Sequence, residues 1–200
     1  NIKKEYFLIK SKHYQFLKTK SKSKLPITWE EDRKYWFLLE AELFKKLGIK
    51  DNYNKLSAWI LSNYMLPSKQ RIHSDVKPIL SYLKKEKYIL GVLTNSDSRY
   101  RAILKYYNIF HFFDYLFISN EVGYKKPSRE IFIYAAEILK INPEQIWYIG
   151  DSYELDIQSA WLAGINRGIL LRRKKNDFNP REIPKHIKVI KTLRTLKTIL

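Results

Sequence analysis

Two carboxylates follow a short apolar run in the last third of the chain, and their spacing is suited to binding a cation. The run 146–149 ends in Gly150 and Asp151, and Asp156 follows five residues later. A continuous apolar run of this length predicts a strand that is buried on both faces. Two carboxylates beyond such a strand form a hard, oxygen-rich site of the kind that Mg²⁺ prefers. Asp156 alone also fits the simpler role of capping the next helix.

Two further polar clusters follow predicted strand ends. Thr94 and Asn95 end the apolar run 88–93, where a hydroxyl, an amide and backbone N–H groups could cradle a phosphate. Lys125 and Lys126 stand directly before Pro127, at the expected start of a helix. Each cluster alone has an ordinary interpretation. Thr or Asn is common as a helix cap, and a lysine pair in a lysine-rich chain is usually solvated.

The pattern from Asp75 onward predicts an α/β core. Apolar residues at helical spacing alternate with short apolar runs, which is typical of βαβ units around a parallel sheet. We expect a doubly wound, Rossmann-like sheet over residues 75–200, with strands at 88–93, 115–118, 146–150, 168–171 and near Val189. In such sheets ligands bind beyond the carboxyl ends of the strands, where Thr94, Asn95, Asp151 and Asp156 fall.

Residues 1–74 carry no strand signal and predict a separate helical unit. A helix is expected over 1–24, and Thr28 with Glu31 fits a capping box for a second helix that ends at Gly48. A third helix is expected over 56–64, before Pro67. The aromatic residues of this unit are interpreted as core packing: Trp29, Tyr35, Trp36 and Trp59.

Composition narrows the possible functions. The 200 residues are 45% hydrophobic, which is ample for a packed core, and no apolar run approaches the roughly 20 residues of a membrane span. Without cysteine there are no thiolate metal sites and no cysteine nucleophile, and we expect a cytoplasmic protein. The net charge of +18 is spread over the predicted helices, so nucleic-acid binding is the less favoured interpretation.

Taken together and in order, these motifs closely resemble the haloacid dehalogenase (HAD) superfamily of hydrolases. The resemblance rests on the segments 93–95, 121–132 and 149–152, with Asp156, Ala160 and Gly164. It covers roughly Asp75 to Leu171, and the helical first third is compatible with the inserted cap of the phosphatase-type members. The family fold is the same α/β core with a helical cap.

The resemblance also implies a role for each polar residue. Thr94 matches the hydroxyl that binds the transferring phosphoryl group, and Asn95 matches the adjacent phosphate contact. Lys126 matches the catalytic lysine that neutralises the nucleophile and the phosphoryl charge. Asp151 matches the acid that holds Mg²⁺, with Asp156 supporting it directly or through water. The implied reaction is Mg²⁺-dependent hydrolysis of a small phosphorylated metabolite, and the metal-type pair argues against dehalogenation.

The chain departs from the family in one respect that bears on catalysis. The family nucleophile is the first Asp of an Asp-x-Asp motif on the first strand, and this chain contains no Asp-x-Asp. Asp32 is the first aspartate, and it lies inside a predicted helix. Because the chain begins with Asn1, we expect a fragment whose nucleophile lies upstream, and we expect this chain alone to be inactive. The alternative is a catalytically inactive binding or regulatory protein. The substrate and the oligomeric state are not readable from the sequence.

Overall fold

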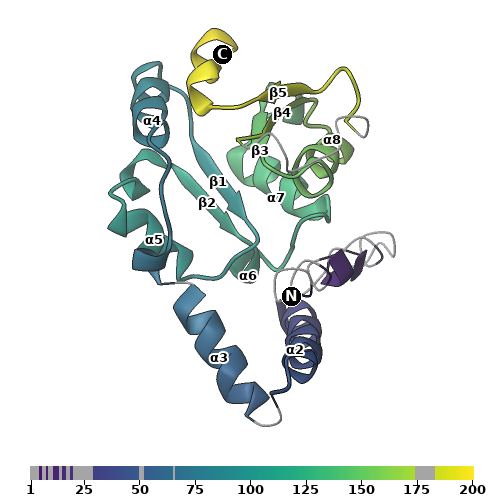
Figure 1. Ribbon diagram of the computed structural model, residues 1–200. Coiled ribbons are helices and arrows are strands. Elements are labelled where there is room, and N and C mark those ends of the chain that lie inside the picture. Colours follow the sequence, from purple (N-terminus) through teal and green to yellow (C-terminus); the bar gives the residue numbers. More distant parts are fainter. Residues whose placement is uncertain are drawn as a thin grey trace.

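The computed structural model (Figure 1) describes residues 5, 8, 11–13, 15, 16, 19, 29–49, 52–64, 66–173 and 183–200. Its strands form two separate parallel ladders. The first pairs β1 (Gly91–Thr94) with β2 (Tyr115–Ile118), and the second has the order β3 (Trp147–Gly150), β4 (Arg167–Leu171), β5 (Lys188–Ile190). Because every pair is parallel, all carboxyl ends within a ladder lie at the same edge.

One helix spans both ladders on the first face of the core. In α4 (Val76–Lys85), Leu80 packs in the same cluster as Val92 of β1. On the same helix, Ile79 and Leu83 pack with Ile169 of β4, in a cluster that the C-terminal turn η6 (Leu193–Thr198) completes. The short helix α5 (Tyr100–Tyr106) covers the rest of this side of β1 and β2. This face therefore holds the two ladders together.

A second helix spans both ladders on the opposite face of the core. In α7 (Glu130–Leu139), Ile131 and Phe132 are fully buried and pack in the same cluster as Leu93 of β1 and Tyr148 of β3. A π-helical turn, η4 (Tyr153–Gln158), and helix α8 (Ser159–Leu162) complete this layer. Successive residues of β1 thus point to opposite helical layers, as the period of a strand requires. The core is an α/β fold of doubly wound, Rossmann-like type.

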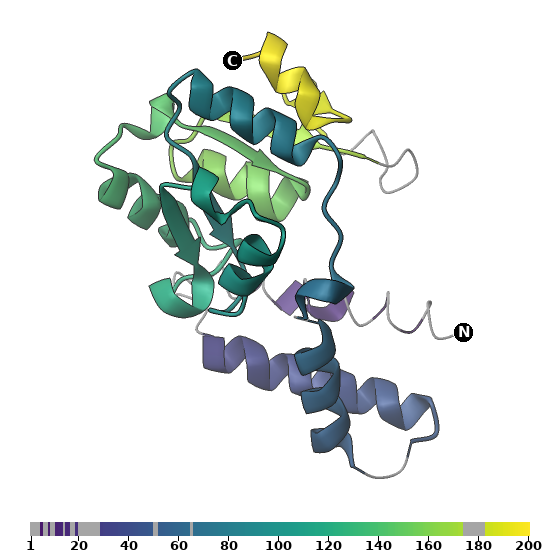
Figure 2. The ribbon, with the colours of Figure 1, turned by 90° about the vertical axis from the view of Figure 1, so that its left-hand side faces the viewer.

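The helices of the first third lie apart from the sheet layers (Figure 2). Helix α2 (Trp29–Lys46) and helix α3 (Tyr53–Tyr64) contact each other, and the described helical residues before them run alongside α2. Ion pairs Lys12–Glu42 (2.7 Å) and Lys46–Glu5 (3.1 Å) fix that segment antiparallel to α2. These helices form a cap of the kind expected, and the boundary at residue 74 remains a prediction.

Most predicted elements are confirmed, with local differences. The strand expected over 88–93 is shorter and later, Gly91–Thr94, and α7 begins three residues after Pro127. The side chains of Tyr35 and Trp36 do pack in the cap, but Trp59 is 62% exposed, so its assignment to packing is wrong. Thr28 and the side chain of Trp29 lie outside the described residues. Among the described helices, none is long and apolar enough to cross a membrane.

Asp75 connects the start of α4 to the end of the chain. Its Oδ2 accepts hydrogen bonds from Arg173 Nη1 (2.8 Å), Thr192 Oγ1 (2.7 Å) and the Leu193 backbone N–H (2.8 Å). Burial raises the pKa of Asp75, but the Arg173 guanidinium and the other two donors outweigh it and hold the pKa well below its usual range. The carboxylate therefore stabilises the fold only while it is ionised.

We predict that Asp75→Asn lowers the free energy of unfolding by about 3 kcal/mol at pH 7, because the partly buried Arg173 guanidinium loses the buried charge that it pairs with. Since the pKa is lowered on folding, the contribution is fully present above the unfolded value of about 4 and is lost as pH falls below it. Urea unfolding at pH 7 and pH 3 should show the difference from wild type shrinking at the lower pH. Glu42→Gln, in the exposed pairs with Lys12 and Lys46, is the control with a much smaller effect. A pH-independent effect of Asp75→Asn would contradict the assignment.

Candidate active site

The polar residues singled out by the sequence gather at the carboxyl ends of β1 and β3. Thr94 ends β1 and Gly150 ends β3, so Asn95 and Asp151 are the first residues beyond the two strands. Direct hydrogen bonds join Lys126 to Asn95 and to Asp156. Hydrogen bonds thus connect four of the five predicted residues at one edge of the core: Asn95, Lys126, Asp156 and Asp151. The fifth, Thr94, directly precedes Asn95.

Asp156 is the centre of this arrangement. It is 3% exposed, and both carboxylate oxygens accept two hydrogen bonds. Oδ1 accepts from Lys126 Nζ (2.6 Å) and the Tyr148 hydroxyl (3.0 Å), and Oδ2 accepts from the backbone N–H groups of Asp151 (3.0 Å) and Ser152 (2.9 Å). A buried carboxylate is tolerated only when such donors replace water. Ser152, not Asp156, caps the following turn, with its Oγ accepting from Leu155 N (3.2 Å).

Lys126 is held at both its backbone and its side chain. The Asn95 side chain bonds the Lys126 backbone twice, accepting from its N–H (2.8 Å) and donating to its carbonyl (2.8 Å). The ammonium group contacts Asp156, the Tyr148 hydroxyl (3.1 Å) and the Leu93 carbonyl (3.5 Å). With the Lys126 side chain 13% exposed and Lys125 6% exposed, the interpretation as a solvated lysine pair is wrong.

Gly150 allows the close approach between strand and carboxylate. A Cβ at this position would lie 2.3 Å from Asp156 Cβ, 2.4 Å from its Cγ and 2.6 Å from its Oδ2. Only a residue without a side chain lets Asp156 fold back over the end of β3 and reach the N–H groups of the Asp151 loop. The Gly-Asp pair in the sequence is therefore a steric requirement of the buried carboxylate.

Asp151 has the opposite environment. Its side chain is exposed, and within the described part of the chain its carboxylate makes no hydrogen bond or ion pair. The described residues contain no group of three or more histidine, cysteine or acidic side chains placed to hold a metal. Asp151 therefore offers one free oxygen ligand at the strand end, whereas the oxygens of Asp156 already have their donors.

Tyr148 belongs to the site but was not singled out from the sequence. Its hydroxyl donates to Asp156 and accepts from Lys126, and the ammonium lies 5.8 Å from the ring centroid. Burial raises the pKa of Tyr148, and the nearby charge of Asp156 raises it further, so the phenol stays protonated. The sequence feature that could have identified Tyr148 is its position two residues before Gly150, because residues two apart on a strand face the same side of it.

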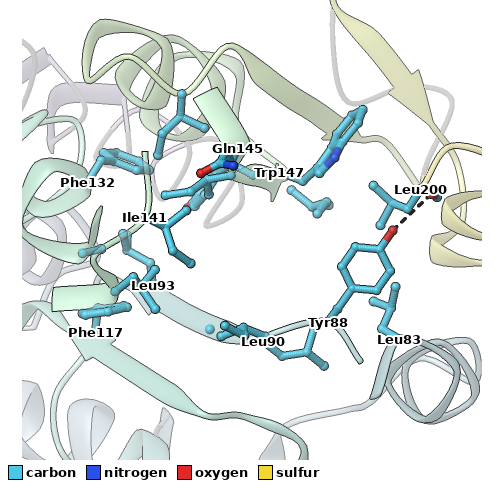
Figure 3. Close-up of a pocket in the computed structure, with 18 of the residues that line it drawn as sticks. Leu83, Tyr88, Leu90, Leu93, Phe117, Phe132, Ile141, Gln145, Trp147 and Leu200 are labelled. Atoms are coloured by element: carbon cyan, nitrogen blue, oxygen red, sulfur yellow. Dashed lines mark hydrogen bonds between the residues drawn. The ribbon is translucent and has the colours of Figure 1, made fainter. Parts of the chain in front are cut away.

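A cavity of ≈ 520 Å³ separates the two ladders. Its walls are β1 with Leu93, β3 with Trp147, α4 with Leu83 and α7 with Phe132 (Figure 3). Tyr148 of β3 also lines it. β1 pairs only with β2 and β3 only with β4, so no ladder joins the facing edges of β1 and β3 in the described residues. Unpaired strand edges present backbone N–H and C=O groups without ladder partners, so an apolar space between two such edges can accept another strand. Tyr148 connects this cavity to Lys126 and Asp156.

We predict that Gly150→Ala destabilises the fold by about 3 kcal/mol or more, because the added methyl displaces Asp156 and leaves buried donors unpaired. The matched control is Gly91→Ala, also on a strand, where a Cβ would meet no atom closer than 3.8 Å. Thermal unfolding of both variants measures the difference. Equal melting temperatures for the two variants would contradict the role given to Gly150.

Comparison with known proteins places this geometry in a family. Residues 3–169 match the family model described as haloacid dehalogenase-like hydrolase. A glyceraldehyde 3-phosphate phosphatase from Methanopyrus kandleri is 35% identical over 111 residues, which is 54% of this chain and 47% of that protein. The chain spans about half the length of the curated relatives that it matches, from 40% to 53% for the first three.

Solved structures agree with the assignment. A HAD phosphatase from Thermococcus onnurineus is 26% identical, with 98% of this chain and 91% of that chain covered and a TM-score of 0.61. The HAD-hydrolase YfnB from Bacillus subtilis, described as bound to magnesium, is 25% identical, with 100% and 82% covered and a TM-score of 0.77. With the family model covering most of the sequence, the chain belongs to the haloacid dehalogenase-like hydrolase family.

Proposed function

We propose that the protein is a Mg²⁺-dependent phosphatase of small phosphorylated metabolites that works through an aspartyl-phosphate intermediate. The observation that carries the proposal is the buried Lys126–Asp156 pair at the edge where β1 ends in Thr94 and the free carboxylate of Asp151 follows β3. A fixed cation, a hydroxyl and an oxygen ligand for a divalent cation are the groups that phosphoryl transfer requires. The relatives that are phosphatases support the same reaction class.

Each residue then has a role in the proposed reaction. The Thr94 hydroxyl and the N–H groups after β1 bind the phosphoryl oxygens, and the Lys126 ammonium offsets the charge that nucleophile and phosphate share. Asp151 would hold Mg²⁺, whose charge balances the phosphoryl oxygens. Asp156 and Asn95 act as positioning residues, because their polar atoms are occupied in fixing Lys126 and the Asp151 loop.

We place the nucleophile on a strand between β1 and β3, outside these 200 residues. The cavity between the ladders is mostly apolar and is bordered by α4, by α7 and by two strand edges that are unpaired among the described residues. A short parallel strand would fit between these edges. Such a strand would end beside Thr94 and Gly150. Its terminal aspartate would attack phosphorus, breaking the ester bond while a second acid protonates the leaving alcohol, and water would then hydrolyse the acyl phosphate.

The test is to extend the N-terminus by an apolar strand ending in Asp-x-Asp, joined through a flexible linker. We predict that the 200-residue chain alone does not turn over p-nitrophenyl phosphate, and that the extended chain hydrolyses it in the presence of Mg²⁺ and stops on addition of EDTA. An extension ending in Asn-x-Asp is the matched control. Both extensions should raise the melting temperature, because both fill the cavity, but only the first should be active. Steady Mg²⁺-dependent turnover by the unextended chain would refute the placement of the nucleophile.

A separate prediction concerns the metal ligand. Asp151→Asn should weaken Mn²⁺ binding to the 200-residue chain at least about tenfold, because a charged ligand is replaced by a neutral one. Water proton relaxation, titrated with Mn²⁺ as a paramagnetic substitute for Mg²⁺, measures the affinity. Glu154→Gln removes a carboxylate three residues further on and should leave the affinity unchanged. If both variants lose affinity equally, the metal is held by general surface charge rather than by Asp151.

A further inference from the structure

A second cavity lies between the cap and the core, beside the loop that follows β1. Its volume is ≈ 380 Å³. The cap contributes Arg33 from α2 and Ala58 and Ser62 from α3. The core contributes Asp97, Ser98 and Arg99 from the loop after β1, and Asn120 from α6 (Ser119–Val122). All of these side chains except that of Ala58 are polar or charged, in contrast to the apolar cavity between the ladders.

This cavity adjoins the proposed phosphate loop. Asp97 follows Asn95 by two residues, and the intervening Ser96 is fixed to the start of α6. Ser96 N–H donates to Ser119 Oγ (3.1 Å), and Asn120 N–H donates to the Ser96 carbonyl (3.2 Å). The wall of the cavity is therefore rigidly connected to the residues that would hold the phosphoryl group. If these residues bind the phosphoryl group of a substrate and its leaving group is directed toward the cap, the leaving group would enter this second cavity.

The charges on the wall do not cancel. Asp97 is already neutralised within its own loop, since Arg99 Nη2 lies 2.6 Å from its Oδ2 and Arg99 Nε lies 2.9 Å from its Oδ1. The Arg99 hydrogen bonds lower the pKa of Asp97, and the charge of Arg33 lowers it further. Arg33, however, is exposed and has no hydrogen bond or ion pair among the described side chains. Among the described residues that line the cavity, two guanidinium groups face one carboxylate, so this lining is net positive and Arg33 is the available donor.

We propose that this cavity binds the leaving group of the substrate and that Arg33 selects a phosphomonoester carrying a second anionic group, a carboxylate. This inference rests on the proposed phosphatase function. A guanidinium donates two parallel hydrogen bonds to a carboxylate, which adds direction as well as charge. Because Arg33 belongs to the cap and the phosphate loop to the core, one substrate would contact both parts of the protein.

The test compares two ligands of similar size that differ at one end. 3-Phosphoglycerate carries a carboxylate where glycerol 3-phosphate carries a hydroxymethyl group. Titration calorimetry with the 200-residue chain and Mg²⁺ at low ionic strength should give about tenfold tighter binding of 3-phosphoglycerate, the effect of one charge-assisted contact. Arg33→Ala should remove that preference, so that the variant binds the two ligands with equal affinity. Lys34→Ala, which removes an exposed neighbouring cation outside the cavity, should retain the preference.

The outcomes separate the two proposals. Equal binding of the two ligands by the wild-type chain, or a preference that survives Arg33→Ala, overturns the selection of a carboxylate and leaves the phosphatase proposal standing. A preference lost equally in Lys34→Ala and Arg33→Ala overturns it too, because general surface charge would then be responsible. Failure of both ligands and of inorganic phosphate to bind counts against the phosphate site itself, and the inference fails with it.

Discussion

The organisation of this site depends on one buried carboxylate. The carboxylate of Asp156 can be buried away from water only because four donors converge on its two oxygens. That requirement accounts for a glycine at position 150, a tyrosine at position 148 and a lysine at position 126. Through Lys126 and Asn95 the same constraint reaches the end of β1, so the carboxyl ends of two strands from different ladders are fixed to each other.

Two aspartates of the site have different roles, and only the surroundings of each side chain distinguish them. Asp156 is enclosed and saturated with donors, so it positions its neighbours. Asp151 is exposed and has no donor among the described residues, so it is the carboxylate available for a cation. The two ladders, fixed at their carboxyl ends by Asp156 and spanned by α4 and α7, enclose an apolar cavity rather than collapsing onto each other. The site and the cavity are consequently parts of one arrangement.

Hydrophobic periodicity was sufficient to predict the alternation of strands and helices, because single buried stripes and short apolar runs are local signals. It also located the polar residues at strand ends, since parallel strands place those ends together.

The sequence could not separate Asp151 from Asp156, because their roles depend on which backbone N–H groups face each side chain. Tyr148 was missed for a related reason: within an apolar strand its hydroxyl is indistinguishable from core packing. Trp59 was misassigned because helical spacing does not reveal how wide the contact between α2 and α3 is. The separation into two ladders was not predicted either, since strand periodicity carries no information about which edges pair.

The central claim is that Thr94, Lys126 and Asp151 surround one phosphate and one divalent cation. A crystal structure of the chain grown with Mn²⁺ and inorganic phosphate tests this most directly, because the anomalous scattering of manganese locates the metal independently of the phosphate. The account predicts manganese bound to the carboxylate of Asp151, with phosphate between the Thr94 hydroxyl and the Lys126 ammonium. Manganese and phosphate bound elsewhere, with Asp151 directed into solvent, would contradict it.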